Sequence, residues 1–110
     1  MKACQRGFNP VYSEEAPTQE EVKALSGDAL LEFGAPWCEH CRAAQPALQR
    51  VLAEYSALPH IKIYDGKGKR LGRAFRVKLW PTLVLLRDGE EVARLVRPVA
   101  ADEMRELLVL

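Results

Sequence analysis

The sequence predicts an α/β fold in which a central mixed sheet of four to five strands carries helices on both faces. Short apolar stretches of strand length alternate with stretches whose apolar residues recur at helical spacing. Asp88-Gly89 is a hairpin signal, so the last two strands should be antiparallel. The 110 residues, 48% hydrophobic and 28% charged, have the length and composition of one domain, residues 1–110.

The first part of the chain supplies a weak strand, a short helix and a core strand. Residues 6–12 are at best an edge strand, because the proline among them cannot donate to a ladder. A helix should begin near Thr18, which stands with Glu21 at capping-box spacing. Residues 29–33 have the pattern of a strand buried on both faces, apart from the carboxylate of Glu32.

A long amphipathic helix is predicted from residue 38 to about residue 55, and Pro46 within it predicts a kink near residues 42–46. The remaining elements are a strand, a short helix, two strands joined by the hairpin and a last helix. Their approximate ranges are 60–64, 71–75, 83–86, 92–96 and 100–109.

Composition also limits the kinds of partner that the chain can bind. A net charge of +1 argues against a basic surface that binds nucleic acid, so a protein partner is expected. No apolar run approaches the roughly 18 residues of a membrane span. The N-terminus lacks the apolar region of a signal peptide, which predicts a cytoplasmic protein.

The chemistry is concentrated in residues 33–42, where an apolar strand stops at a glycine and Cys38 and Cys41 open a helix. A thiol at a helix N-terminus is expected to be acidic, because unpaired backbone N–H groups and the helix dipole favour the thiolate. Two cysteines three residues apart can also close a small disulfide ring. From spacing alone, this pair is equally compatible with half of a zinc site.

Three further features accompany the cysteine pair: Trp37 directly before it, Pro46 five residues after its second cysteine, and the segment Trp80-Pro81-Thr82. With these features the sequence resembles the thioredoxin family over roughly residues 20–109, while residues 1–15 match only weakly. The resemblance implies a thioredoxin fold and a thiol–disulfide oxidoreductase. Such an enzyme needs no bound cofactor, acts on protein disulfides and is reset by a separate reductase or oxidant.

The resemblance also implies roles for individual residues. Cys38 would attack the substrate disulfide, and Cys41 would resolve the mixed disulfide. Pro81 matches the family's cis-proline, and Trp80 before it would offer its backbone N–H and C=O to an extended substrate segment. Trp37 would form part of the same substrate-binding surface.

His40 and Glu39, inside the motif, are expected to tune the redox potential. A positive charge on His40 would stabilise the Cys38 thiolate and make the disulfide a better oxidant, whereas Glu39 would act in the opposite direction. The C-x-H-C pattern resembles protein disulfide isomerases and periplasmic oxidases. We therefore expect a potential above that of an ordinary thioredoxin; the alternative is that His40 is exposed and without influence.

Glu32 lies six residues before Cys38, where thioredoxins carry a buried aspartate and disulfide isomerases a glutamate. Burial predicts a raised pKa for Glu32, which suits an acid/base that takes the Cys41 proton, directly or through water. Lys62 would modulate it as a nearby charge. The alternative is that Glu32 reaches the surface from a strand end. His60, at a strand start, is expected to be a surface or edge residue and not a catalyst.

The chain departs from reducing thioredoxins where they usually have a tryptophan, here Gly34, and where they have a glycine in the substrate-facing loop, here Arg97-Pro98. Together with Arg42 and Trp80, these departures predict a narrower and more cationic docking surface.

A cytoplasmic reductase is the leading prediction because the sequence has no export signal. His40 points instead to a more oxidising, isomerase-like enzyme, which is one alternative. A redox-sensing interaction module is another. A zinc or iron–sulfur site would need Cys38, Cys41, His40 and Cys4 to converge. Cys4 is otherwise expected to be a free thiol, or else a regulatory or dimer-forming one.

Overall fold

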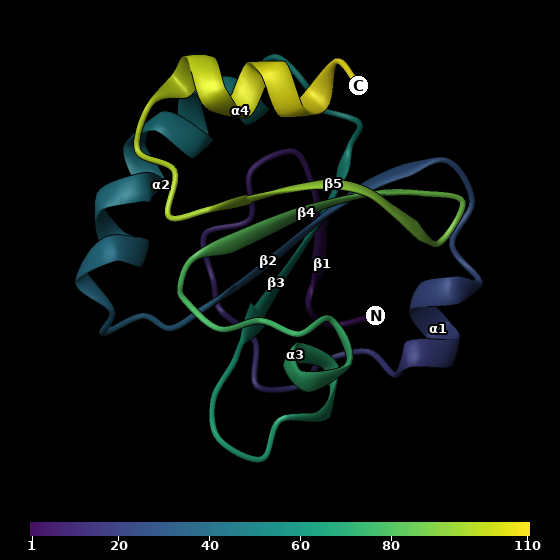
Figure 1. Cartoon of the computed structure of the whole chain (residues 1–110). Helices are drawn as coiled ribbons and strands as arrows, with labels where there is room; N and C mark the ends of the chain where they lie inside the picture. The colour runs from purple at the N-terminus through teal and green to yellow at the C-terminus, as the bar shows by residue number, and fades with distance from the viewer.

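The computed structural model describes all of residues 1–110 and contains one five-stranded sheet, in the order β1-β3-β2-β4-β5. The strands β2 and β3 are parallel, and every other neighbouring pair is antiparallel. The predicted mixed sheet is thereby confirmed (Figure 1). The strands are β1 (Cys4–Arg6), β2 (Asp28–Gly34), β3 (Pro59–Tyr64), β4 (Thr82–Arg87) and β5 (Glu90–Val96); the helices are α1 (Gln19–Lys23), α2 (Glu39–Leu52), α3 (Arg70–Ala74) and α4 (Ala101–Leu108).

Helices cover both faces of the sheet, as predicted, and each face has its own core (Figure 1). On the face of α1 and α3, Val22 and Leu71 pack against the sheet residues Leu31, Phe33, Ile61, Ile63, Val84 and Leu86. On the face of α2 and α4, Leu48 and Met104 pack against Leu30, Leu83 and Leu85. Because successive strand residues alternate between the faces, β2 contributes to both cores and is the centre of the domain.

Two local sequence signals are confirmed in detail. Glu21 N donates to Thr18 Oγ1 at 3.1 Å and Thr18 N donates to Glu21 Oε1 at 3.0 Å, which is the reciprocal pattern of a capping box. Asp88 and Gly89 have φ values of 52° and 80°, as a tight hairpin turn between antiparallel strands requires.

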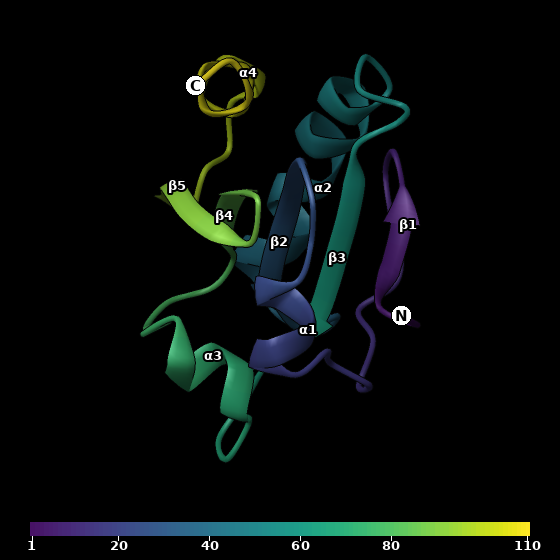
Figure 2. The same cartoon turned by 90° about the vertical axis from the view of Figure 1, so that its right-hand side faces the viewer.

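The N-terminal strand differs from the expectation. The edge strand is β1, Cys4–Arg6, which pairs with β3 (Figure 2). It ends at Gly7, whose φ of 75° turns the chain out of the extended conformation. Residues 7–12 instead form a connection that leaves this edge of β3 and returns to it, where Ser13 pairs with Ile63.

The long helix α2 runs from Glu39 to Leu52 and continues through Pro46, so the proline does not end it. Cys38 is its N-cap rather than its first residue, and the helix stops three residues before Tyr55. The length and apolar character needed to cross a membrane are found in none of the helices.

Candidate functional site

The two cysteines of the motif sit at different depths at the start of α2. Cys38 caps the helix, and its sulfur accepts a hydrogen bond from Cys41 N at 3.2 Å. Cys38 is 8% exposed, Cys41 is 0% exposed, and both are free thiols. Cys38 therefore keeps a small exposed area and Cys41 has none, which is the order of access that a two-step exchange requires.

The inner thiol is held in its protonated form. Burial and the hydrogen bond with Cys38 raise the pKa of Cys41 to about 12, although contacts with the Ala35 backbone and the Tyr12 hydroxyl act in the opposite direction. Cys41 thus needs a proton acceptor before it can act as a nucleophile near neutral pH.

Two tryptophans flank the cysteine pair. The rings of Trp37 and Trp80 meet edge to face with centroids 5.5 Å apart. Trp37 donates to the hydroxyl of Tyr64 at 2.7 Å, and Trp80 donates to the carboxylate of Asp65 at 3.0 Å. The Trp80–Pro81 peptide bond is cis, as predicted, and Trp37 is 62% exposed beside it.

Arg97 closes over the backbone that precedes the cis bond. Arg97 has a φ of 53°. The backbone N–H of Arg97 donates to Pro81 O at 2.8 Å, and the side-chain Nε donates to Trp80 O at 2.9 Å. The carbonyl that we expected Trp80 to offer to a substrate is therefore already paired. The exposed Arg97 side chain lies at this edge of the site, where a cationic residue was predicted.

Behind the cysteines lies a buried polar cluster centred on Glu32, which is 0% exposed. Its Oε2 accepts from Gln45 Nε2 at 2.9 Å and from the hydroxyl of Tyr12. Its Oε1 accepts from His60 Nε2 at 2.8 Å and lies 4.0 Å from Lys62 Nζ. The alternative that Glu32 reaches the surface is wrong, whereas the proximity of Lys62 is as predicted.

The predicted rise in the pKa of Glu32 is also wrong. Burial does favour the neutral acid, but the hydrogen bond and electrostatic influence of His60, the positive charge of Lys62 and the hydrogen bond from Tyr12 outweigh it. The pKa of Glu32 is therefore lowered, and the side chain is a carboxylate near neutral pH. For Lys62, burial favours the neutral amine and lowers the pKa, although the negative charges of Glu32 and Cys41 act in the opposite direction.

His60 is not the surface or edge residue that we expected, because it is 0% exposed and its strand β3 lies between β1 and β2. Asn9 N donates to His60 Nδ1 at 2.9 Å, so the ring proton is on Nε2 and points to Glu32. Strand alternation could have indicated this position, since residues two apart in a strand share a face. His60 and Lys62 are two apart in β3, and Lys62 pairs in register with Glu32 of β2.

Tyr12, Gln45 and Asn9 are members of the cluster that sequence reasoning missed. Lys62 Nζ donates to Asn9 O at 2.9 Å and also to the side chain of Gln45. Tyr12 and Asn9 belong to the connection after β1, and no local pattern in that segment indicates that it packs against the side chains of His60 and Lys62.

Gly34 makes room for Tyr12 beside the inner cysteine. A Cβ atom at Gly34 would lie 2.7 Å from Cys41 Sγ and 2.8 Å from the Tyr12 hydroxyl oxygen. Both contacts are too short for a real Cβ, so this position excludes every side chain in the observed arrangement. The sequence showed the unusual glycine but not the residue that occupies the space.

The other predicted residues occupy the periphery of the site. Glu39, His40 and Arg42 are exposed on the first turn of α2, and their tuning and docking roles remain predictions. Cys4 is half-buried in the edge strand β1. No three histidine, cysteine or acidic side chains are grouped so that they could hold a metal ion, so the four ligands required by the metal alternative are not brought together.

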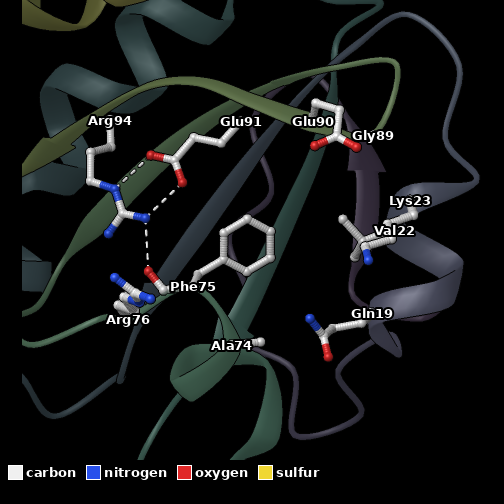
Figure 3. Close-up of a pocket in the computed structure, with 10 residues that line it drawn as sticks. All are labelled: Gln19, Val22, Lys23, Ala74, Phe75, Arg76, Gly89, Glu90, Glu91 and Arg94. Carbon is white, nitrogen blue, oxygen red and sulfur yellow. Dashed lines mark hydrogen bonds and ion pairs between the residues drawn. The ribbon is translucent and has the colours of Figure 1, made fainter.

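A separate hollow lies at the opposite end of the sheet, between α1, the end of α3 and the β4–β5 hairpin (Figure 3). Its volume is about 290 Å³. Arg94 in its wall pairs with both carboxylate oxygens of Glu91 at 2.7 Å and donates to Phe75 O at 2.7 Å. These charged groups are paired with one another, and no cysteine lines the hollow.

Comparisons with known proteins agree with this geometry. The family model described as Thioredoxin matches residues 9–109. A reduced thioredoxin 2 structure from Pseudomonas aeruginosa PAO1 is 52% identical, with a TM-score of 0.82 and coverage of 92% of this chain and 94% of that one. A Chlamydia pneumoniae thioredoxin is 40% identical over 64% of this chain and 70% of its own length. A protein disulfide-isomerase from Datisca glomerata is 27% identical over 79% of this chain but only 20% of its own length.

Proposed function

The chain belongs to the thioredoxin family, whose members are thiol–disulfide oxidoreductases, and from this premise we propose that it reduces disulfide bonds of protein substrates in the cytoplasm. The observation that carries the proposal is the pairing of a thiol at the helix N-terminus with a buried thiol one turn further in. A reductase requires a compartment that keeps its dithiol reduced, which is the reason for the cytoplasmic assignment.

The proposed reaction has two steps. The Cys38 thiolate attacks one sulfur of the substrate disulfide, and the other substrate sulfur leaves as a thiolate that takes up a proton. Cys41 then loses its proton and attacks Cys38 Sγ, which releases the second substrate sulfur and leaves a Cys38–Cys41 disulfide. A separate dithiol reductant must return the pair to the reduced state.

Reduction of insulin by dithiothreitol, with and without the protein, tests this function. The wild-type chain should accelerate the precipitation of the insulin B chain, and Cys38→Ser should abolish the acceleration. Cys41→Ser should accumulate a mixed disulfide detectable by mass spectrometry. A wild-type rate no faster than that of dithiothreitol alone would contradict the proposed activity.

We assign Glu32 as the acceptor for the Cys41 proton and Lys62 as the charge that keeps it ionised. The lowered pKa of Glu32 supports this role, because the carboxylate is already deprotonated when the proton arrives. The raised pKa of Cys41 does not oppose it. Formation of the new S–S bond removes the charge that would otherwise build up on sulfur, so the proton becomes acidic as the bond forms.

His40 is the residue on which the direction of the reaction depends. It is exposed on the first turn of α2 near Cys38, where a positive charge would stabilise the thiolate. We therefore expect His40→Pro to lower the reduction potential measured against glutathione. An unchanged potential would remove His40 from the tuning role, and a wild-type potential well above that of thioredoxins would favour the isomerase-like alternative.

Arg97 and the two tryptophans form the proposed substrate-binding surface. A substrate segment that pairs with the backbone beside Pro81 must displace Arg97 Nε from Trp80 O. A substrate carboxylate near the disulfide would accept a hydrogen bond from the displaced Arg97 side chain and so replace the bond to Trp80 O. Arg97→Ala should therefore narrow the difference in kcat/KM between acidic and neutral peptide disulfides.

The redox-sensing alternative has a distinct signature. A sensor would bind one partner tightly in a single redox state and would turn over insulin slowly. Calorimetric binding of candidate partners to the reduced and oxidised forms, combined with the insulin assay, separates the two functions.

A further inference from the structure

The path between the inner cysteine and its proton acceptor is occupied by a protein side chain. No hydrogen bond joins Cys41 to Glu32 directly, whereas the hydroxyl of Tyr12 donates to Glu32 Oε2. The Tyr12 hydroxyl oxygen and the Cys41 sulfur border the same Cβ position that Gly34 leaves vacant, at 2.8 and 2.7 Å from it, and the contact between this hydroxyl and the thiol acts to lower the pKa of Cys41. Tyr12 also packs against the small cluster formed by Ala35, Cys38 and Cys41.

We propose that the hydroxyl of Tyr12 relays the proton from Cys41 to Glu32 during resolution of the mixed disulfide, a role that rests on the proposed reductase function. Tyr12 donates to the carboxylate and accepts from Gln45 Nε2 at 3.3 Å, which leaves the second lone pair of its oxygen to accept from the thiol. A single hydroxyl thereby acts as acceptor toward Cys41 and as donor toward Glu32.

The step balances without any additional reactant. The Cys41 S–H bond breaks and its proton passes to the Tyr12 oxygen, while the Tyr12 proton passes to Glu32 Oε2. The sulfur electron pair of Cys41 forms the bond to Cys38 Sγ, and the electron pair of the Cys38–substrate bond leaves on the substrate sulfur. When the disulfide is reduced again, Glu32 returns the proton by the reverse path.

The surroundings of Tyr12 favour a concerted transfer. Burial and the neighbouring Glu32 carboxylate raise the pKa of Tyr12, so a tyrosinate is not formed as an intermediate. Gln45 holds the acceptor oxygen in place, because its Nε2 donates to Glu32 Oε2 at 2.9 Å and to the Tyr12 oxygen at 3.3 Å. His60 fixes the other carboxylate oxygen at 2.8 Å.

The relay also adjoins solvent. A hollow of about 430 Å³ opens beside it and is lined by Tyr12, Gln45 and Lys62, together with Pro10, Val11, Pro36 and Arg42. Small buffer molecules can therefore approach the phenol side of the cluster, while Glu32 itself stays covered.

Single-turnover reduction of insulin by the pre-reduced protein tests the relay. Acid quenching followed by mass spectrometry counts the mixed disulfide and separates the rate of attack by Cys38 from the rate of resolution by Cys41. The Tyr12→Phe variant keeps the ring and removes only the hydroxyl. The matched control is Tyr55→Phe, which removes a hydroxyl from a half-buried residue packed against the core under α2 and α4.

In Tyr12→Phe we expect resolution to slow by at least about tenfold, with attack unchanged, so that the mixed disulfide accumulates. Tyr55→Phe should match wild type in both steps. Resolution in Tyr12→Phe at a rate within about twofold of wild type would overturn the relay while leaving the reductase function intact. Failure of the wild-type protein to reduce insulin in this assay would remove both proposals together.

A measurement on the wild-type protein does not depend on the folding of any variant. If two protons move together, the resolution rate should fall along a curve as the D₂O fraction of the solvent increases. A straight line would mean that one proton moves, and would overturn the relay through Tyr12. A merely structural role of Tyr12 predicts the straight line.

Discussion

Two groups of paired charges at opposite ends of the sheet use the same chemistry in different surroundings. Around Glu32, a carboxylate, a lysine and a histidine are buried to 1% exposure or less beside the inner cysteine. In the hollow of Figure 3, Glu91 and Arg94 form a bidentate pair whose side chains remain about one-third exposed. The first group has lost its water, whereas the second has kept much of it.

Burial decides what each group does. Water and salt screen an exposed pair, so its removal changes the free energy of unfolding only slightly. A buried charge has no water to replace a lost partner, so every member of the Glu32 cluster depends on the others. No side-chain nitrogen or oxygen that is buried in the structure is left without a hydrogen bond, which shows how completely the cluster is paired.

Removal of the central carboxylate should have the largest effect. Glu32→Ala leaves Lys62 and the Nε2–H of His60 buried without their partner, which should lower the free energy of unfolding by about 3–5 kcal/mol. Urea denaturation followed by circular dichroism measures this loss. The same variant should slow the resolution of the mixed disulfide at pH 7. A loss of unfolding free energy below about 1 kcal/mol would mean that the buried cluster contributes no more to stability than the exposed pair.

A single methyl group at the boundary of the cluster should have the next largest effect. Gly34→Ala places a Cβ against Cys41 Sγ and the Tyr12 oxygen, and such overpacking should cost about 1–3 kcal/mol. The matched control is Gly66→Ala, which meets nothing within 4 Å and lies outside the positive-φ region. Equal losses of stability in the two variants would show that the space beside Cys41 is not filled as described.

Acidification should distinguish the buried carboxylate from its replacement. Because the folded-state pKa of Glu32 lies below its ordinary value of 4.5, its contribution to stability is complete above that pH and is lost as the pH falls through the folded-state value. Each unit of pKa depression corresponds to about 1.4 kcal/mol. Urea midpoints measured between neutral pH and pH 3 should therefore fall more steeply for wild type than for Glu32→Gln; parallel curves would contradict the lowered pKa.

The exposed pair should show the smallest effect. Glu91→Gln removes one charge from the pair with Arg94 and should change the free energy of unfolding by at most about 1 kcal/mol. The difference should shrink further in 1 M salt, because screening acts on exposed charges. A salt-independent loss comparable to that of Glu32→Ala would show that partial exposure does not weaken this pair.

The sequence predicted the features that short-range patterns encode. The capping box at Thr18, the Asp88-Gly89 hairpin and the depth difference of Cys38 and Cys41 each depend on residues a few positions apart. The cis bond before Pro81 was predicted from the family resemblance rather than from any pattern in the residues.

The cluster around Glu32 could be predicted only in part, because its members come from segments far apart in the chain. Lys62 was placed correctly, yet His60 was assigned to the surface although it shares a strand face with Lys62. The pKa of Glu32 was predicted in the wrong direction because burial was visible in the sequence and the donors were not. Tyr12 and Asn9 reach the cluster through an irregular connection that has no periodicity to reveal its path.

The vacant Cβ position at Gly34 links two residues that are distant in sequence. Any chain of this fold that regains a side chain at this position must give up the phenol from Tyr12 or move the inner sulfur, because all three would need the same volume. Positions 12 and 34 are therefore expected to change as a pair in the descendants of this protein, and a designer who wishes to transplant the tyrosine into another thioredoxin must transplant the glycine with it.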